Sequence, residues 1–231
     1  MRCHYKNRKG FTLAEILITL GIIGVVAALT INSIVVNYQK NQTVAKLKKV
    51  YSTLKQATEF AKNEYGNVDS WDFTLDDLSF AQKYYIPFLS VLEDRGTSSS
   101  NEYIYTDLSG ISKTLRRPLF ILSDGTYLFF LVNRSFDIKY HLIADINGSK
   151  LPNKVGRDIF VFSVYNDALQ TYNQYIDDIN GAFRKRSVVL GNGGTSGQCN
   201  KKSLGGVLGS GSYCSRLIEM DGWTIAPDYP W

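Results

Sequence analysis

The chain has 231 residues, of which 44% are hydrophobic and 20% are charged, a composition that excludes a disordered protein. The formal net charge of +5 would favour a nucleic-acid or anionic-membrane partner if the folded part carried it. Residues 1–10, however, hold four basic residues and no acidic one, so a chain that starts at residue 11 is close to neutral. The charge therefore indicates no specific nucleic-acid partner. The two histidines, His4 and His141, are too few for a histidine-based metal site.

A long apolar segment follows the basic start of the chain. Residues 16–39 contain no charged side chain and are dominated by Ile, Leu, Val and Ala. A helix of this length spans roughly 36 Å, enough to cross the hydrocarbon core of a bilayer. We therefore predict a membrane-spanning helix over residues 11–36. Because basic residues precede it closely, the short N-terminus is expected in the cytoplasm and the chain after Lys40 on the outer side.

Glu15 stands at the start of this apolar segment. A charged side chain inside a bilayer is unfavourable by about 2.5 kcal/mol or more unless it has a partner or lies near the interface. If the chain is cut between Gly10 and Phe11, the new amino group of Phe11 becomes a cation one helical turn away, or in a neighbouring copy. The alternative is an interfacial Glu15 whose carboxylate reaches the lipid headgroups.

The residues around Glu15 form a recognisable pattern. A basic leader is followed by a glycine, an aromatic residue, a glutamate four positions later and an apolar helix, with KGFTLAE at residues 9–15. This pattern resembles the processing site of type IV prepilins and type II secretion pseudopilins. The resemblance implies that a prepilin peptidase removes the leader, residues 1–10, by cutting after Gly10, and that Phe11 is then N-methylated. It also implies that Glu15 pairs with this amine in an adjacent subunit during filament assembly.

The same resemblance implies the setting in which the chain works. Its partners would be the prepilin peptidase, other pilin or pseudopilin subunits and an assembly platform in the inner membrane. The chain would be a single-pass protein of that membrane, with an extracytoplasmic head, before it enters a pilus or pseudopilus. Two other interpretations remain open: a secretory signal peptide cleaved after Ala28, and an anchor that is never cut.

Residues 37–66 are predicted to continue the helix with an amphipathic pattern. Apolar residues recur at steps of three and four, and the lysines lie largely on other faces. The apolar positions are Val44, Leu47, Val50, Tyr51, Leu54, Ala57, Phe60 and Ala61. The basic face could contact lipid phosphates or acidic groups of neighbouring subunits, or it could be a solvated helix face. Gly66-Asn67 predicts that the helix ends near Tyr65.

Residues 67–231 are predicted to form one α+β head. The segment Thr74-Leu75-Asp76-Asp77 indicates the start of a short helix that runs toward Tyr85. A β-hairpin is predicted from residues 119–122 and 127–132, with Asp124-Gly125 at the turn. Further strands are expected at residues 140–144 and 159–164. A long N-terminal helix packed on an antiparallel sheet is the pilin architecture that the resemblance implies.

Oxygen-bearing side chains cluster between the last two predicted strands. Asp145 and Asn147 lie two positions apart and are followed by a glycine, and Asp158 precedes the next strand. Such residues in a tight turn suit a hard cation such as calcium, with backbone carbonyls completing the ligand set. The segment lacks the spacing of an EF-hand loop, and Asp and Asn also favour turns by bonding their own backbone. No cofactor is firmly indicated, and calcium is the candidate ion.

Cys199 and Cys214 remain as a pair once the leader with Cys3 is removed. They bracket a segment rich in Gly, Ser and Lys that has too few apolar residues to hold itself by packing. Outside the membrane, a disulfide closing this loop would contribute about 3 kcal/mol. A redox dithiol is the alternative, although no Cys-x-x-Cys occurs. A C-terminal disulfide loop also resembles the pilin head.

Patterns typical of enzymes do not occur in the sequence. The glycine-rich runs at residues 191–194 and 209–211 do not continue into the Lys-Ser/Thr of a phosphate-binding loop. No histidine is placed to activate a serine or cysteine nucleophile. We therefore predict a structural filament subunit and not an enzyme. The alternative function is a membrane-anchored binding protein whose head contacts a ligand without polymerising.

Overall fold

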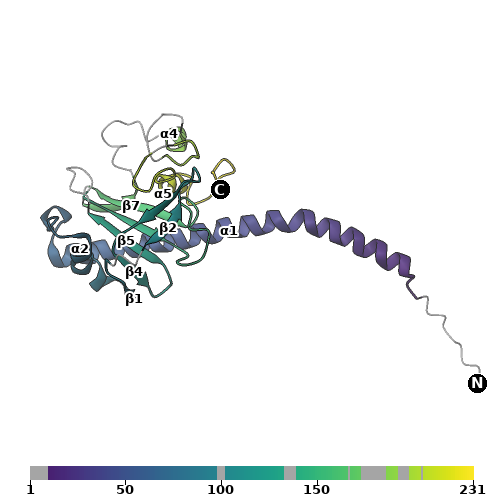
Figure 1. Ribbon diagram of the computed structural model, residues 1–231, viewed down its shortest axis with the longest axis horizontal. Helices are drawn as coiled ribbons and strands as arrows, with labels where there is room; N and C mark the ends of the chain where they lie inside the picture. The colour runs from purple at the N-terminus through teal and green to yellow at the C-terminus, as the bar shows by residue number, and fades with distance from the viewer. Residues whose placement is uncertain are drawn as a thin grey trace, which may run out of the picture. The chain divides into compact units, whose positions relative to one another are not determined.

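The computed structural model describes residues 10–97, 102–132, 139–165, 167–172, 186–191, 198–203 and 205–231 (Figure 1). The chain divides into two compact units, Met1–Asn41 and Gln42–Trp231. The leader over residues 1–9 lies outside the described residues, as does most of the glycine-rich run at 191–194.

The first unit is dominated by the start of helix α1 (Leu13–Tyr65, 53 residues). This helix is long and apolar enough to cross a membrane. Its large apolar side chains are exposed, with Leu17 at 61% and Leu29 at 76% of full exposure. Nothing lies within 4 Å of the place where a side chain would start at Gly21 or Gly24. The first unit therefore leaves its apolar surface uncovered.

The second unit begins with the rest of α1, which packs one face into the head. The buried residues of this face are Leu47, Val50, Leu54, Ala57, Thr58 and Ala61, six members of a periodic stripe. Phe60 belongs to the predicted apolar face but is not buried with it, because 54% of Phe60 is exposed. Its ring centroid lies 6.4 Å from that of Phe88. The helix ends as predicted, where Gly66 takes a φ of +82° and donates its N–H to the Lys62 carbonyl at 2.9 Å.

A six-stranded antiparallel sheet forms the centre of the head. Its strands, in spatial order, are β1 (Val91–Asp94), β4 (Leu119–Leu122), β5 (Tyr127–Val132), β6 (Tyr140–Asp145), β7 (Ile159–Tyr165) and β8 (Ala168–Thr171). Every residue of β4 and β6 is buried. Figure 1 shows the second half of α1 running along one face of this sheet. The predicted α+β, pilin-like architecture of a long helix on an antiparallel sheet is therefore confirmed.

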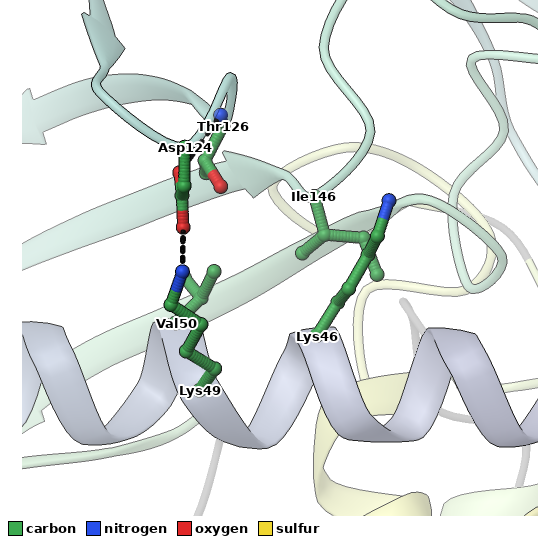
Figure 2. Close-up of a pocket in the computed structure, with 6 residues that line it drawn as sticks. All are labelled: Lys46, Lys49, Val50, Asp124, Thr126 and Ile146. Atoms are coloured by element: carbon green, nitrogen blue, oxygen red, sulfur yellow. Dashed lines mark hydrogen bonds and ion pairs between the residues drawn. The ribbon is translucent and has the colours of Figure 1, made fainter.

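The predicted hairpin is β4 and β5, paired with Leu119 opposite Phe129. Its turn is stabilised by Asp124, whose carboxylate accepts the Thr126 N–H at 3.1 Å, and by Gly125 at a φ of +84°. Asp124 also accepts a bond from Lys49 of α1 at 2.8 Å, which ties the turn to the helix (Figure 2). A cavity of about 80 Å³ beside this pair is far below the roughly 300 Å³ of typical ligand pockets.

Short helices and a second hairpin surround the sheet. Asp76 caps α2 (Asp77–Tyr84) by accepting the Leu78 and Ser79 N–H groups, both at 2.9 Å. The remaining elements are the 3₁₀ turns η1 (Val68–Ser70) and η2 (Ile86–Phe88), the hairpin β2 (Tyr103–Thr106) with β3 (Ser112–Leu115), and the helices α4 (Arg186–Leu190) and α5 (Cys214–Met220). The predicted short helix is thus confirmed.

The C-terminal part of the head is held by a disulfide and an ion-pair cluster. Cys199 and Cys214 are bonded and fully buried, so the predicted disulfide is confirmed. Arg186, at the start of α4, donates to both Asp221 and Asp228. These contacts join α4 to the C-terminal segment, where Leu217, Ile218 and Tyr229 also pack into the core.

Candidate functional site

The junction between the leader and α1 contains a reciprocal set of hydrogen bonds. The Thr12 N–H and hydroxyl both donate to Oε2 of Glu15, at 2.8 and 2.9 Å. In return, the Glu15 N–H donates to Oγ1 of Thr12 at 3.2 Å. This arrangement is a capping box, in which the residue before a helix and its third residue satisfy each other's free groups. The signal is present in the sequence as Thr-x-x-Glu at residues 12–15, whereas we interpret Glu15 from the sequence as a partner for an amine or as an interfacial carboxylate and not as part of a helix cap.

The capping box changes the interpretation of Glu15. Two donors of Thr12 already bond one carboxylate oxygen of Glu15, Oε2. The carboxylate also lies near the positive end of the helix dipole. Such a carboxylate is less costly to hold at the edge of an apolar region than a bare one. The pairing of Glu15 with the Phe11 amine, which the sequence suggested, is not needed to satisfy Glu15 in a single subunit.

Gly10 and Phe11 lie before the helix and are accessible. Phe11 is 86% exposed. A Cβ atom placed on Gly10 would have open space around it to 4 Å. A peptide bond that is exposed and outside regular structure can enter the active site of a protease. The geometry at residues 10 and 11 is therefore compatible with cleavage.

The structure brings the three candidate metal ligands together in the head. Asp145 ends β6 opposite Ile159, and Asp158 stands just before β7, with the Ile146 N–H donating to its carbonyl at 2.9 Å. Asp145 accepts the Asn147 N–H at 3.0 Å on Oδ1 and the Tyr103 hydroxyl on Oδ2. Sequence reasoning missed Tyr103, because it lies on β2, 42 residues earlier, and no local spacing points to it.

Both carboxyl groups of this cluster are buried. Asp145 is fully inaccessible and Asp158 is 2% exposed. Burial, with a smaller contribution from the nearby charge of Asp158, raises the pKa of Asp145 to about 7. Burial likewise raises the pKa of Asp158 to about 6. Within the described residues, no three His, Cys, Asp or Glu side chains gather closely enough to hold a metal ion, so a cation here would also need amide ligands.

The chain matches two family models. A prokaryotic N-terminal methylation motif matches residues 5–31. A family of unknown function (DUF6613) matches residues 33–231. The searches of curated proteins and of solved structures gave no match. The first match confirms the resemblance to the prepilin-type segment and supports a structural subunit of the pilin or pseudopilin type.

Proposed function

The chain belongs to the DUF6613 family and carries a prokaryotic N-terminal methylation motif, and on this basis we propose that it is a filament subunit of the pilin or pseudopilin type. Prepilin peptidase cuts after Gly10, Phe11 is N-methylated, and the subunit assembles through the first half of α1. Its role is structural and not catalytic. The observation that carries the proposal is the motif at residues 5–31 placed directly on a helix with an uncovered apolar surface.

The exposed apolar surface needs two successive environments in this proposal. Before assembly, residues 11–36 lie in the inner membrane, with the leader in the cytoplasm and the head on the outer side. During assembly the helix leaves the lipid and packs against the helices of other subunits. Both environments remove the same side chains from water, so the transfer between them need not carry a large hydrophobic cost.

Glu15 has a specific task in this transfer. In the single subunit it is held by Thr12, as the 2.8 and 2.9 Å bonds indicate. In the filament, the methylated amine of Phe11 from a neighbouring subunit takes the place of one or both donors. The amine brings a full positive charge that the Thr12 donors lack, and its attraction to the carboxylate is strong in a low-dielectric bundle. The ion pair thereby sets the register between subunits.

Processing is tested first. The chain is expressed with a prepilin peptidase, beside a Gly10→Val variant, and both are analysed by intact mass and N-terminal sequencing. We expect a new N-terminus at Phe11 with one added methyl group, and no cut in the variant. A start after Ala28 would identify a secreted soluble protein, and an uncut chain would identify a plain anchor; either result contradicts the proposal.

Assembly is tested next with matched substitutions on one helix. Glu15→Val should abolish filaments and co-assembly, as seen by electron microscopy and crosslinking. Glu64→Val changes an exposed glutamate of the same helix within the head, so it should leave assembly intact. If Glu15→Val assembles like the unmodified chain, the role proposed for Glu15 is wrong. If neither chain forms filaments or co-assembles, an anchored, non-polymerising binding protein is the better description.

A further inference from the structure

Several buried oxygen atoms between β6 and β7 lack hydrogen-bond partners. They are both carboxylate oxygens of Asp158 and the Oδ1 atoms of Asn147 and Asn153. Asp158 is 98% buried, since only 2% of it is exposed. A buried carboxylate without a partner is costly, and such groups in folded proteins are normally paired or bound to an ion or water.

The backbone holds these oxygens in one small region. A tight turn brings Asn153, at a φ of +48°, back toward Asp158, whose N–H donates to the Lys154 carbonyl at 3.0 Å. The backbone N–H groups of Asn153 and Lys154 and the Asn147 amide lie close enough to lower the pKa of Asp158. None of them forms a hydrogen bond of normal geometry with its carboxylate. The donors present therefore leave Asp158 under-satisfied.

The hairpin β2–β3 closes the region from the other side. The Thr106 N–H donates to the Asn153 carbonyl at 2.9 Å, and the Val155 N–H donates to the Thr106 carbonyl at 3.0 Å. Tyr103, on the same strand as Thr106, donates to Asp145. The oxygens thus all belong to the connection over residues 145–158, which β2 contacts at Asn153 and Val155, so the site is largely formed by the fold.

From this geometry we propose that Asp145, Asn147, Asn153 and Asp158 form a binding site for one calcium ion. Asp158 supplies two oxygens, each asparagine supplies one, and Asp145 has spare lone pairs beside the bonds it already accepts. Two carboxylates balance the charge of a divalent cation. Oxygen ligands in an irregular arrangement suit calcium, which takes six to eight of them, better than magnesium with its strict octahedron. Zinc is disfavoured because it prefers nitrogen and sulfur ligands.

Binding of calcium would stabilise the head, since the ion binds the folded connection over residues 145–158 and not the unfolded chain. The full chain in detergent micelles is first stripped of metal with a chelator, and calcium or magnesium is then added. Isothermal calorimetry should show one calcium site, and the melting temperature should rise with calcium more than with magnesium. Absence of both a binding signal and a melting shift at millimolar calcium would overturn the proposal and leave a purely structural turn.

Asp158→Asn separates a ligand role from a folding role. It removes a buried charge without changing size, so the metal-free variant should fold at least as well as the unmodified chain. Its calcium affinity should fall by about tenfold or more, because ligand charge tunes affinity over decades. Asp124→Asn is the matched control, as Asp124 also caps a turn but is paired with Lys49. Equal loss of calcium binding in both variants would contradict the proposed site.

Terbium provides a local readout, because Tyr103 lies against Asp145. Terbium in a calcium site emits when a nearby tyrosine is excited. The emission should be displaced by calcium, be reduced in Tyr103→Phe and be lost in Asp158→Asn. Emission that persists in Asp158→Asn would place the ion elsewhere and overturn the assignment.

Discussion

The two halves of α1 carry similar apolar residues, and these residues meet opposite surroundings. In the first half, Leu17 and Leu29 are 61% and 76% exposed, whereas in the second half Leu47 and Leu54 are fully buried. Fully burying such a side chain contributes about 1.5 to 3 kcal/mol. The second half therefore obtains its stabilisation within the chain, and the first half must obtain it from lipid or from other subunits.

Under the proposed function, this difference separates the residues that fold the head from the residues that assemble a filament. Residues that fold the head contact other residues of the same chain, so their substitution changes its free energy of unfolding. Residues 11–36 contribute little to that quantity, and under the proposed function their substitution should change membrane insertion or assembly instead. The following predictions test this separation, from the largest expected effect to the smallest.

A leucine-to-alanine substitution should change the free energy of unfolding strongly in the second half of α1 and hardly in the first half. Leu54→Ala should lower the free energy of unfolding of the head by roughly 2 to 5 kcal/mol, because it empties a fully buried position. Leu29→Ala should change it by less than about 0.5 kcal/mol. Both are measured by guanidinium unfolding of the full chain in micelles, with tryptophan fluorescence as the signal. A destabilised head in Leu29→Ala would show that the first half does support the head.

The disulfide should stabilise the head and have no effect on processing at Gly10. Replacing Cys199 and Cys214 together by serine should lower the free energy of unfolding by about 3 kcal/mol, the value for closing a loop of about 15 residues. Processing at Gly10 should be unchanged, which mass spectrometry of the same preparation checks. A reduced but fully stable head would instead indicate that Arg186 and its two aspartates hold this segment without the bond.

His141 should make the stability of the head depend on pH. It is 4% exposed, packs edge-on against Tyr172, and burial lowers its pKa from 6.5 to about 4. Between these values the unfolded chain binds a proton that the folded head does not, so stability is lost as pH falls from 6.5 toward 4.

Comparison with His141→Phe isolates this contribution from the two buried aspartates, whose raised pKa values act in the opposite direction. The contribution of His141 across this interval should be roughly 3 kcal/mol. This contribution is the change, between these pH values, in the difference between the unfolding free energies of the two proteins. Parallel pH profiles would mean that His141 is not buried as a neutral ring.

Local chemistry explains which features were predictable from the sequence. Gly66 predicts a helix end and Asp124-Gly125 predicts a turn, because few residues other than glycine take a positive φ without strain. The strand β1 was not predicted, because Val91–Asp94 is short and mostly exposed, and its pairing with β4 depends on distant residues. The metal-ligand candidates were predictable as a loop, but Asn153 and Tyr103 join them only through the packing of β2 against that loop.

The strand order also bears on how the head acquires its structure. From β4 to β8, each described strand pairs with the next one in the sequence, and β1 joins β4 at one edge. Contacts between neighbours in sequence need little loop closure, so they favour rapid folding. A sheet of this kind can grow strand by strand from the β4–β5 hairpin. The strands β4 to β8 can thus pair in the order in which they occur in the sequence, whereas β1 and the packed half of α1 contact residues that come much later in the chain.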